Sequence, residues 1–439
     1  MSIKYVNILI IIEHTAREFE SACLLKYQYE ALGYTAEIVG IYPNKEMIPS
    51  RYKADIILIP WAYSDKDMQF FKCFLRNSPD AIFINLHHEQ YSGQDDQNIC
   101  LPKGESRLMY HISWGKKFTD SLIACGCAKE SILEFGNIKL DIYKKNMSGL
   151  FWSKDFLSRQ YNIDATKRWV LFIANGFHLM DDRKLESIAE KDPGISKKAS
   201  TGIKCREDFL SFVHKYLSTS NDVVFIYRPH PYFAMLDIQS DDIKKLLLEH
   251  KHNFFAISDY AIGNWIVNAD LCLSFHSTSA VECCVSGVPY YLFRTQTLPE
   301  NQDYSFFVGY PYVIKSYADF CSAVSTSQYS NDELMARLKD YYSINDEMTY
   351  VKIALKSLAC DNLYKLNVST TDLIKNNIKA YLKAAIFNLS KIEFFYKVFE
   401  KYGDDRWLRI ISNSDTFTNN AVNKFIKRLK NINHPTAMN

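Results

Sequence analysis

Short apolar runs alternate with amphipathic segments along the first third of the chain. The runs that have the length of buried strands are 7–12, 36–42, 55–60 and 81–86. Between them, 15–32 and 65–76 carry apolar residues at helical spacing, and Gly33 is a typical helix end. Strands that alternate with helices predict right-handed crossovers and a parallel sheet covered on both faces.

A second series of the same kind follows a polar, irregular stretch that ends near Lys167. Its expected strands are 169–174, 223–227, 254–257, 271–274 and 290–293. The long polar segment 181–204 is expected to be a mobile loop near a site or a surface excursion. From about residue 316 onward the pattern is helical.

These patterns predict an α/β protein with two Rossmann-like domains that face each other across a cleft. The expected domains are 1–150, 165–345 and a C-terminal helical segment at 346–439. In the last piece, 419–429, apolar residues lie opposite lysines and an arginine. Such a helix either lies on a membrane surface or packs on the protein body with a solvated outer face.

Composition narrows the class of protein. The 439 residues include 52 Lys and Arg against 50 Asp and Glu, so charge balance gives no reason to expect a nucleic-acid partner. We see no signal peptide and no run of about 18 apolar residues, and 11 cysteines are scattered without a framework. We therefore expect a cytoplasmic protein that could associate with the inner membrane as a peripheral protein. We expect no metal site at Cys125-Gly126-Cys127.

The most informative stretch follows the expected strand 271–274. Ser277, Thr278 and Ser279 open a short helix that Gly287-Val288-Pro289 ends. In a parallel sheet this turn lies at the carboxyl end of its strand, where ligands bind in open α/β folds. Hydroxyls and backbone N–H groups at a helix N-terminus suit a phosphate, although Ser277 or Thr278 could also serve only as a helix cap.

A second turn, Arg228-Pro229-His230-Pro231, directly follows the expected strand 223–227. Its two prolines keep the backbone out of helix and ladder. The guanidinium of Arg228 and the imidazole of His230 could then meet a phosphate, or they could only satisfy nearby carbonyl groups.

Together these turns, with Glu282 and Gly287-Val288-Pro289, resemble the donor domain of GT-B-fold glycosyltransferases. The sequence is most similar to bacterial capsule and O-antigen transferases that use CMP-activated Kdo or sialic acid. Further parts of the resemblance are 262–270, Gly136-Asn137 with Asp141, and 172–175. The resemblance extends from about residue 130 to 300 and is weaker in the N-terminal domain.

The resemblance implies roles for individual residues. His230, Ser277, Thr278 and Ser279 would contact the nucleotide phosphate, and Glu282 would bind the ribose hydroxyls. Asn175 belongs to the same donor-binding set, and Arg228 would hold a carboxylate or stabilise the departing CMP. No Asp-x-Asp motif stands out at a strand end, so no metal and no other cofactor is expected, and protein donors would stabilise the leaving group.

The function implied is transfer of a sugar from a nucleotide-activated donor, with CMP-Kdo as the best candidate, to a growing lipopolysaccharide O-antigen or capsule. Its partners would be the nucleotide-sugar donor and a glycan or lipid-linked glycan acceptor. Two alternatives stay open: a CDP-alditol-dependent polyol-phosphate transferase, and a non-catalytic nucleotide-sugar-binding assembly subunit.

Catalysis needs a base that takes the proton of the acceptor hydroxyl. Two turns of the first domain carry such groups, and the order of preference is Glu89, His88, Glu18. A charge at a helix N-terminus or a buried hydrogen-bonded histidine would explain each of them equally well. Asp181 or Asp182 could act as a nucleophile if transfer proceeds by double displacement.

Overall fold

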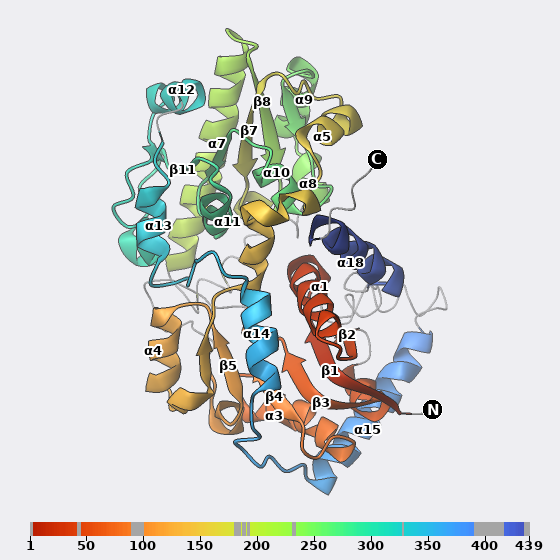
Figure 1. Ribbon diagram of the computed structural model, residues 1–439. Coiled ribbons are helices and arrows are strands. Elements are labelled where there is room, and N and C mark those ends of the chain that lie inside the picture. Colours follow the sequence, from red (N-terminus) through yellow and green to blue (C-terminus); the bar gives the residue numbers. More distant parts are fainter. Residues whose placement is uncertain are drawn as a thin grey trace. The chain divides into compact units, whose positions relative to one another are not determined.

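Two parallel six-stranded sheets organise the residues that the computed structural model describes (Figure 1). These residues are 3–41, 45–88, 101–179, 186, 190, 194–230, 234–326, 329–389 and 417–433. By its contacts the chain divides into two units. Unit 1 comprises Met1–Tyr91, Ile99–Ile142 and Asp340–Asn439, and unit 2 comprises Ser92–Asn98 and Tyr143–Lys339.

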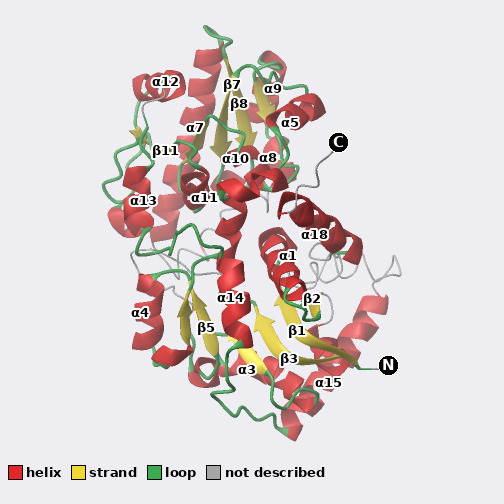
Figure 2. Ribbon diagram, in the orientation of Figure 1, coloured by secondary structure: helices red, strands yellow, loops and turns green. Residues whose placement is uncertain are grey.

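The sheet of unit 1 has the strand order β2-β1-β3-β4-β5-β6. Its strands are β1 (Lys4–Ile12), β2 (Ala36–Gly40), β3 (Tyr52–Ile59), β4 (Ile82–Asn85), β5 (Tyr110–Ser113) and β6 (Ile132–Glu134). Its sheet helices are α1 (Thr15–Ala31), α3 (Asp65–Phe71) and α4 (Lys116–Ala124). In the register, Ile10 lies opposite both Ile38 and Leu58. Helices lie on either side of the strands (Figure 2), which is why β1 reads as one continuous apolar run.

The sheet of unit 2 has the order β12-β11-β10-β7-β8-β9. Its strands are β7 (Arg168–Ile173), β8 (Val223–Arg228), β9 (Phe254–Ala256), β10 (Leu271–Ser274), β11 (Tyr290–Phe293) and β12 (Val313–Ile314). Its helices are α5 (Lys154–Tyr161), α7 (Gly194–Leu217), α8 (Ala234–Ile238), α9 (Asp241–Glu249), α10 (Ile262–Ile266), α11 (Ser279–Ser286), α12 (Tyr317–Ser325) and α13 (Asp332–Leu338). Phe172 at the centre of the sheet lies opposite both Tyr227 and Leu273, so the expected α/β architecture is confirmed.

Helix α7 corrects the expectation of a loop over 181–204 for the part from residue 194 onward; most of 181–193 lies outside the described residues. It begins at Gly194, and its buried face continues into the core of unit 2 through Cys205 and Phe209. At its start, however, that face includes the polar residues Lys198 and Thr201, which are buried together with Ala199. A helical face that mixes buried polar residues with small ones gives only a weak apolar period, and so the sequence pattern did not reveal it.

The C-terminal residues group with unit 1, whereas a separate helical segment was expected at 346–439. Helix α14 (Thr349–Leu358) packs on α1, where the hydroxyls of Tyr29 and Ser357 lie 2.6 Å apart. Helix α15 (Thr370–Leu389) contacts α3, and α18 (Asn419–Asn433) contacts α1. Amphipathic spacing shows that a helix has a face to bury, but it does not show which sheet that face covers.

The basic helix at the C-terminus packs on the protein body. Val422, Ile426 and Leu429 of α18 are buried, and the ring of Phe425 lies 6.2 Å from that of Phe19. Its lysines are exposed. Within the described residues, no helix combines the length and the apolar character that crossing a membrane requires.

Candidate functional site

The order of strands in unit 2 indicates where ligands bind at the edge of its sheet. Strands β8 and β9 lie on one side of β7, and β10 to β12 lie on the other. Sheets with this order bind ligands outside the carboxyl ends of the strands where the order reverses. Here that point lies between β7 and β10, which end at Ile173 and Ser274. Because all strands are parallel, the turn after β8 lies at the same edge.

The serine-rich turn leaves β10 and opens α11. The hydroxyl of Ser277 accepts a hydrogen bond from the Ser279 N–H at 3.2 Å, so Ser277 serves as a local cap. Thr278 is the N-cap residue by position, yet its side chain makes no capping bond within the described residues, and it is exposed. Glu282 is buried one turn into the helix. The phosphate and ribose roles of these residues stay predictions.

A cluster of charged side chains that the sequence analysis did not identify lies beside this turn. Lys198 Nζ lies 3.1 Å from His276 Nε2, and the ring of Tyr304 stacks on His276 at 4.0 Å. Arg294 grips the carboxylate of Asp303 with both terminal nitrogens, at 2.5 and 2.7 Å, and its Nε donates to the Phe275 carbonyl. Arg294 directly follows β11, so it lies at the carboxyl end of a parallel strand, as the serine turn does. This position in the sequence could have identified it as a candidate.

The electrostatics of this cluster favour an anion. Burial, with the charges of Lys198 and Arg294 nearby, holds the pKa of His276 well below its usual range. His276 is therefore neutral, and its Nε2 accepts from the Lys198 ammonium. Lys198 and the Arg294–Asp303 pair thus bring two cationic side chains close to the serine hydroxyls.

Arg228 binds backbone carbonyls rather than pointing freely at the edge. Its guanidinium donates to the carbonyl oxygens of Ile257 and Asp259, at 3.0 and 2.7 Å, and also to that of Tyr260. Burial lowers the pKa of Arg228 to about 10. The side chain thus fixes the turn between β9 and α10, and Tyr260 in that turn has a left-handed φ of 62°.

The remaining donor-site candidates lie on the turns that follow β7 and β8. Asn175 accepts from the Phe177 N–H at 3.0 Å, across Gly176 with its φ of 73°. A Cβ at Gly202 of α7 would lie 2.7 Å from the Phe177 ring, so α7 approaches this turn closely. His230 is exposed directly after the buried Pro229.

In unit 1 the order of strands reverses between β1 and β3, and Glu18 lies after β1. Its carboxylate is buried and accepts from the Glu13 N–H at 2.7 Å. The Glu13 carboxylate in turn accepts from the indole N–H of Trp61, which follows β3. Burial raises the pKa of Glu18 to about 8, so this group can exchange a proton near neutral pH.

Three histidines occupy the neighbouring part of the same edge: His87 and His111 are buried, and His88 is half-buried. Nε2 of His87 lies 2.9 Å from Nδ1 of His111, and His87 has a left-handed φ of 48°. Burial holds the pKa of His87 well below its usual range and lowers those of His88 and His111 to about 4. Nε2 of His88 and Nδ1 of His87 have no hydrogen-bond partner among the described residues. The imidazoles are therefore neutral at physiological pH.

Three predicted catalytic residues, Glu89, Asp181 and Asp182, lie outside the described residues. The described part of the chain contains one group of side chains spaced to hold a metal ion, formed by His214, Glu249 and His250. It lies near the C-terminal ends of α7 and α9, away from the turns described above. The expectation of transfer without a metal stays a prediction.

Similarity to known proteins was found among solved structures only. No protein-family model matches the chain, and no curated protein matches it. A protein from Listeria monocytogenes provisionally described as a UDP-N-acetylglucosamine 2-epimerase superposes with a TM-score of 0.50 at 13% identity, over 83% of this chain and 100% of that one. A variant of the wall teichoic acid polymerase TagF gives 0.51 at 13% identity, over 81% and 89%. With the two parallel sheets, these neighbours confirm the predicted GT-B fold.

Proposed function

We propose that the protein is a glycosyltransferase that moves a sugar from a nucleotide-activated donor to a growing surface glycan. One observation carries the proposal. At the edge of unit 2 where ligands bind in such sheets, a hydroxyl-rich helix N-terminus lies beside Lys198 and the Arg294–Asp303 pair. Hydroxyls, backbone N–H groups and cationic side chains are the kinds of groups that bind a nucleotide phosphate.

The proposed donor is CMP-Kdo, and the proposed acceptor is an O-antigen or capsule glycan, free or lipid-linked, at the cytoplasmic side of the inner membrane. This choice depends on the resemblance of the Arg228-Pro229-His230 and Ser277-Thr278-Ser279 turns to transferases that use CMP-activated acidic sugars. His230 and the three hydroxylated residues would bind the phosphate, and Glu282 the ribose. Lys198 joins them as a cation that stabilises the leaving CMP.

Arg228 has a different role in this proposal from the one that the resemblance implies. Because its guanidinium binds the carbonyls of Ile257, Asp259 and Tyr260, it acts as a positioning residue for the turn beside the donor. Among the described candidates for the base, Glu18 has the most suitable pKa, since a base works best near the operating pH.

A second candidate function is favoured by one comparison. The fold neighbour TagF is a wall teichoic acid polymerase. The two turns of this chain also resemble those of enzymes that transfer an alditol phosphate from a CDP donor. Transfer of a polyol phosphate from a CDP-alditol would use the same phosphate-binding edge. A non-catalytic nucleotide-sugar-binding subunit would keep the edge without turnover.

Melting curves recorded with CMP, CDP, UDP and GDP test the nucleotide, because a ligand that binds only the folded protein raises its apparent stability. Turnover then separates the functions. Release of CMP from CMP-Kdo supports the sugar transferase, and release of CMP from a CDP-alditol supports the polyol-phosphate transferase. Binding of CMP without turnover of either donor supports the non-catalytic subunit, and no binding of any nucleotide refutes all three.

His230→Ala tests the phosphate site directly. We expect donor turnover to fall at least about a hundredfold, since a lost charge-assisted contact to phosphate weakens binding and leaving-group stabilisation together. His252→Ala changes another exposed histidine of unit 2 and is the matched control. Full turnover in His230→Ala shows that the phosphate site has been assigned wrongly.

A further inference from the structure

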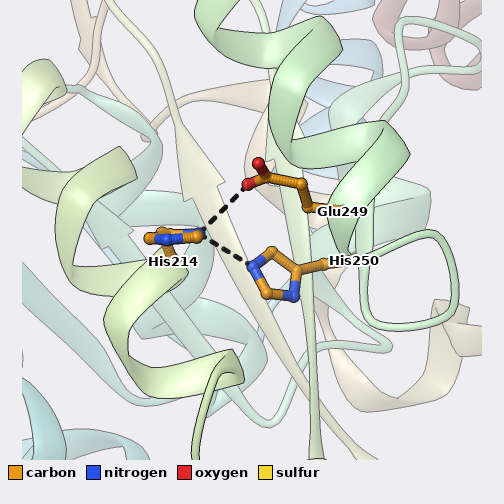
Figure 3. Close-up of side chains that lie close together, drawn as sticks. All are labelled: His214, Glu249 and His250. Atoms are coloured by element: carbon orange, nitrogen blue, oxygen red, sulfur yellow. Dashed lines mark hydrogen bonds and ion pairs between the residues drawn. The ribbon is translucent and has the colours of Figure 1, made fainter.

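A cluster of two histidines and a glutamate joins helices α7 and α9 in unit 2. His214 lies in the last turn of α7, Glu249 is the last residue of α9, and His250 is the residue that follows (Figure 3). Nδ1 of His214 lies 3.0 Å from Nε2 of His250 and 3.3 Å from Oε2 of Glu249. All three potential ligand atoms lie within 4.8 Å of one another. Nothing in the proposed transfer reaction uses these residues.

We propose that His214, Glu249 and His250 form a site for a divalent transition-metal ion, for which Zn²⁺ has the best-matched chemistry. Zn²⁺ binds imidazole nitrogen and carboxylate oxygen at about 2.0–2.2 Å. Ligands at the corners of a tetrahedron of that size lie roughly 3.3 Å apart, as simple geometry requires for those bond lengths. The two separations from His214, 3.0 and 3.3 Å, are close to this value, and the third lies within 4.8 Å.

The hydrogen bonding within the cluster supports a cation at its centre. The Glu249 carboxylate only accepts, so it draws a proton on His214 Nδ1, and the His250 Nε2 lone pair faces the same proton. Figure 3 draws the two interactions of His214 Nδ1, with Glu249 and with His250, as dashed lines. A metal ion that replaces this proton receives a lone pair from each of the three side chains.

The helix ends add a second, independent contribution. His214 lies near the C-terminus of α7, and Glu249 and His250 lie at that of α9. Carbonyl groups at a helix C-terminus carry partial negative charge and favour a cation. Of the neighbouring cations, the Lys245 ammonium lies 4.0 Å from Oε1 of Glu249, which leaves Oε2 directed at His214. Lys215 lies over the ring of Tyr317.

The position of the site indicates what the metal does. Helix α7 runs back from the carboxyl end of β7 toward the start of β8, and α9 ends shortly before β9. The site therefore lies at the opposite edge of the sheet from the serine turn. An ion there bridges two helices that pack on each other, so it stabilises unit 2 without joining the transfer reaction. With three protein ligands and exposed side chains, water completes its coordination.

Cobalt(II) is the probe, because its visible absorption reports coordination directly. We expect Co²⁺ added to the metal-free full-length protein to give the intense visible bands of a four- or five-coordinate nitrogen and oxygen site, with one equivalent bound. Zn²⁺ should displace it and raise the melting temperature by about 5 °C at a hundredfold excess over its dissociation constant. A near-ultraviolet thiolate band would assign the ion to the cysteines and overturn the proposal.

Variants decide whether these three residues bind the ion. His214→Ala and His250→Ala should each weaken Co²⁺ binding at least about tenfold, and Glu249→Gln should weaken it while keeping the side-chain size. His252→Ala, an exposed histidine next to the cluster, should bind Co²⁺ as the wild type does. Unchanged melting of the metal-free variants shows that they fold. Equal metal binding in His214→Ala and the wild type, or no binding in either, overturns the proposal.

Discussion

The two sheets end in edges that handle charge in opposite ways. At the carboxyl edge of unit 1, burial removes charge: the pKa of Glu18 is raised to about 8, and those of His88 and His111 are lowered to about 4. At the carboxyl edge of unit 2, charge is kept and compensated, as in the Arg294–Asp303 pair and in the contact of Lys198 with His276.

The difference shows that sheet topology selects where a site lies but not its chemistry. A neutral edge suits proton exchange, because a buried group whose pKa lies near the working pH gives and takes protons readily. A cationic edge suits the binding of phosphate. The side chains that lie at the strand ends decide between the two. In unit 2, the first turns of α7 place Lys198 there.

The largest expected effect concerns Glu18→Gln. The folded protein keeps a proton on Glu18 up to about pH 8, whereas the unfolded chain releases it near 4.5, so wild-type stability falls as pH rises between these values. At about 1.4 kcal/mol per pKa unit, this loss reaches up to about 5 kcal/mol, and the amide should abolish it. Urea unfolding at pH 5 and pH 8 measures it. Exposed Glu207→Gln is the control, and a slope unchanged by Glu18→Gln would mean that Glu18 is ionised when folded.

Arg294→Leu breaks the charged edge of unit 2. Asp303 then stays buried without its cation, and we expect the free energy of unfolding to drop by about 3–5 kcal/mol. Replacing both residues by leucine should restore much of the loss, since no isolated charge remains. Lys204→Leu, which removes an exposed ion pair with Glu207, should leave the urea midpoint unchanged. If Arg294→Leu alone is as stable as the wild type, Arg294 does not compensate the buried charge of Asp303.

His111→Asn sharpens the neutral edge of unit 1. Because the folded pKa of His111 is lowered to about 4, the unfolded chain binds a proton first, and stability is lost as pH falls from 6.5 toward 4. The amide of Asn lies near the position of Nδ1 but does not titrate. The loss of unfolding free energy between pH 6.5 and pH 4 should therefore shrink by up to about 3 kcal/mol. Urea midpoints at pH 7 and pH 4.5 test this, with His252→Asn as control. An unchanged acid slope refutes the lowered pKa.

The smallest effects separate a helix cap from a phosphate ligand. Ser277→Ala removes the acceptor of the Ser279 N–H and should cost about 1 kcal/mol of stability, whereas Thr278→Ala should cost none measurable. If the turn also binds the donor, both variants raise the donor KM. If Ser277→Ala changes only the melting temperature and Thr278→Ala changes nothing, the turn is a cap alone.

The sequence predicts the sheets well because parallel strands covered on both faces are continuous apolar runs. It also locates the Ser277 and Arg228 turns, since both follow such runs directly. It misses Lys198 because a buried lysine near the start of α7 interrupts the apolar pattern by which a buried helix face is recognised. It cannot tell whether Arg228 binds a phosphate or the carbonyls of its own domain, because a guanidinium suits both.

The left-handed backbone of His87 and the side of the molecule that α14 covers are equally hidden from the sequence. Asn85 accepts from the His87 N–H at 3.1 Å and so stabilises that local conformation, but many Asn-x-His sequences have no such geometry. The apolar positions of α14 fit several sheets, and only the contact with α1 identifies unit 1 as its partner. Long-range packing therefore limits prediction more than local propensity does.

Unit 1 is assembled from two distant parts of the chain, residues up to Ile142 and those from Asp340 onward. During synthesis on the ribosome, all six strands of its sheet emerge first, but α14 emerges only after the last strand of unit 2, which ends at Ile314. The later-made unit can thus complete its core before the earlier one. The surface of α1 that α14 covers meanwhile remains exposed on the nascent chain, where it is a natural target for chaperones.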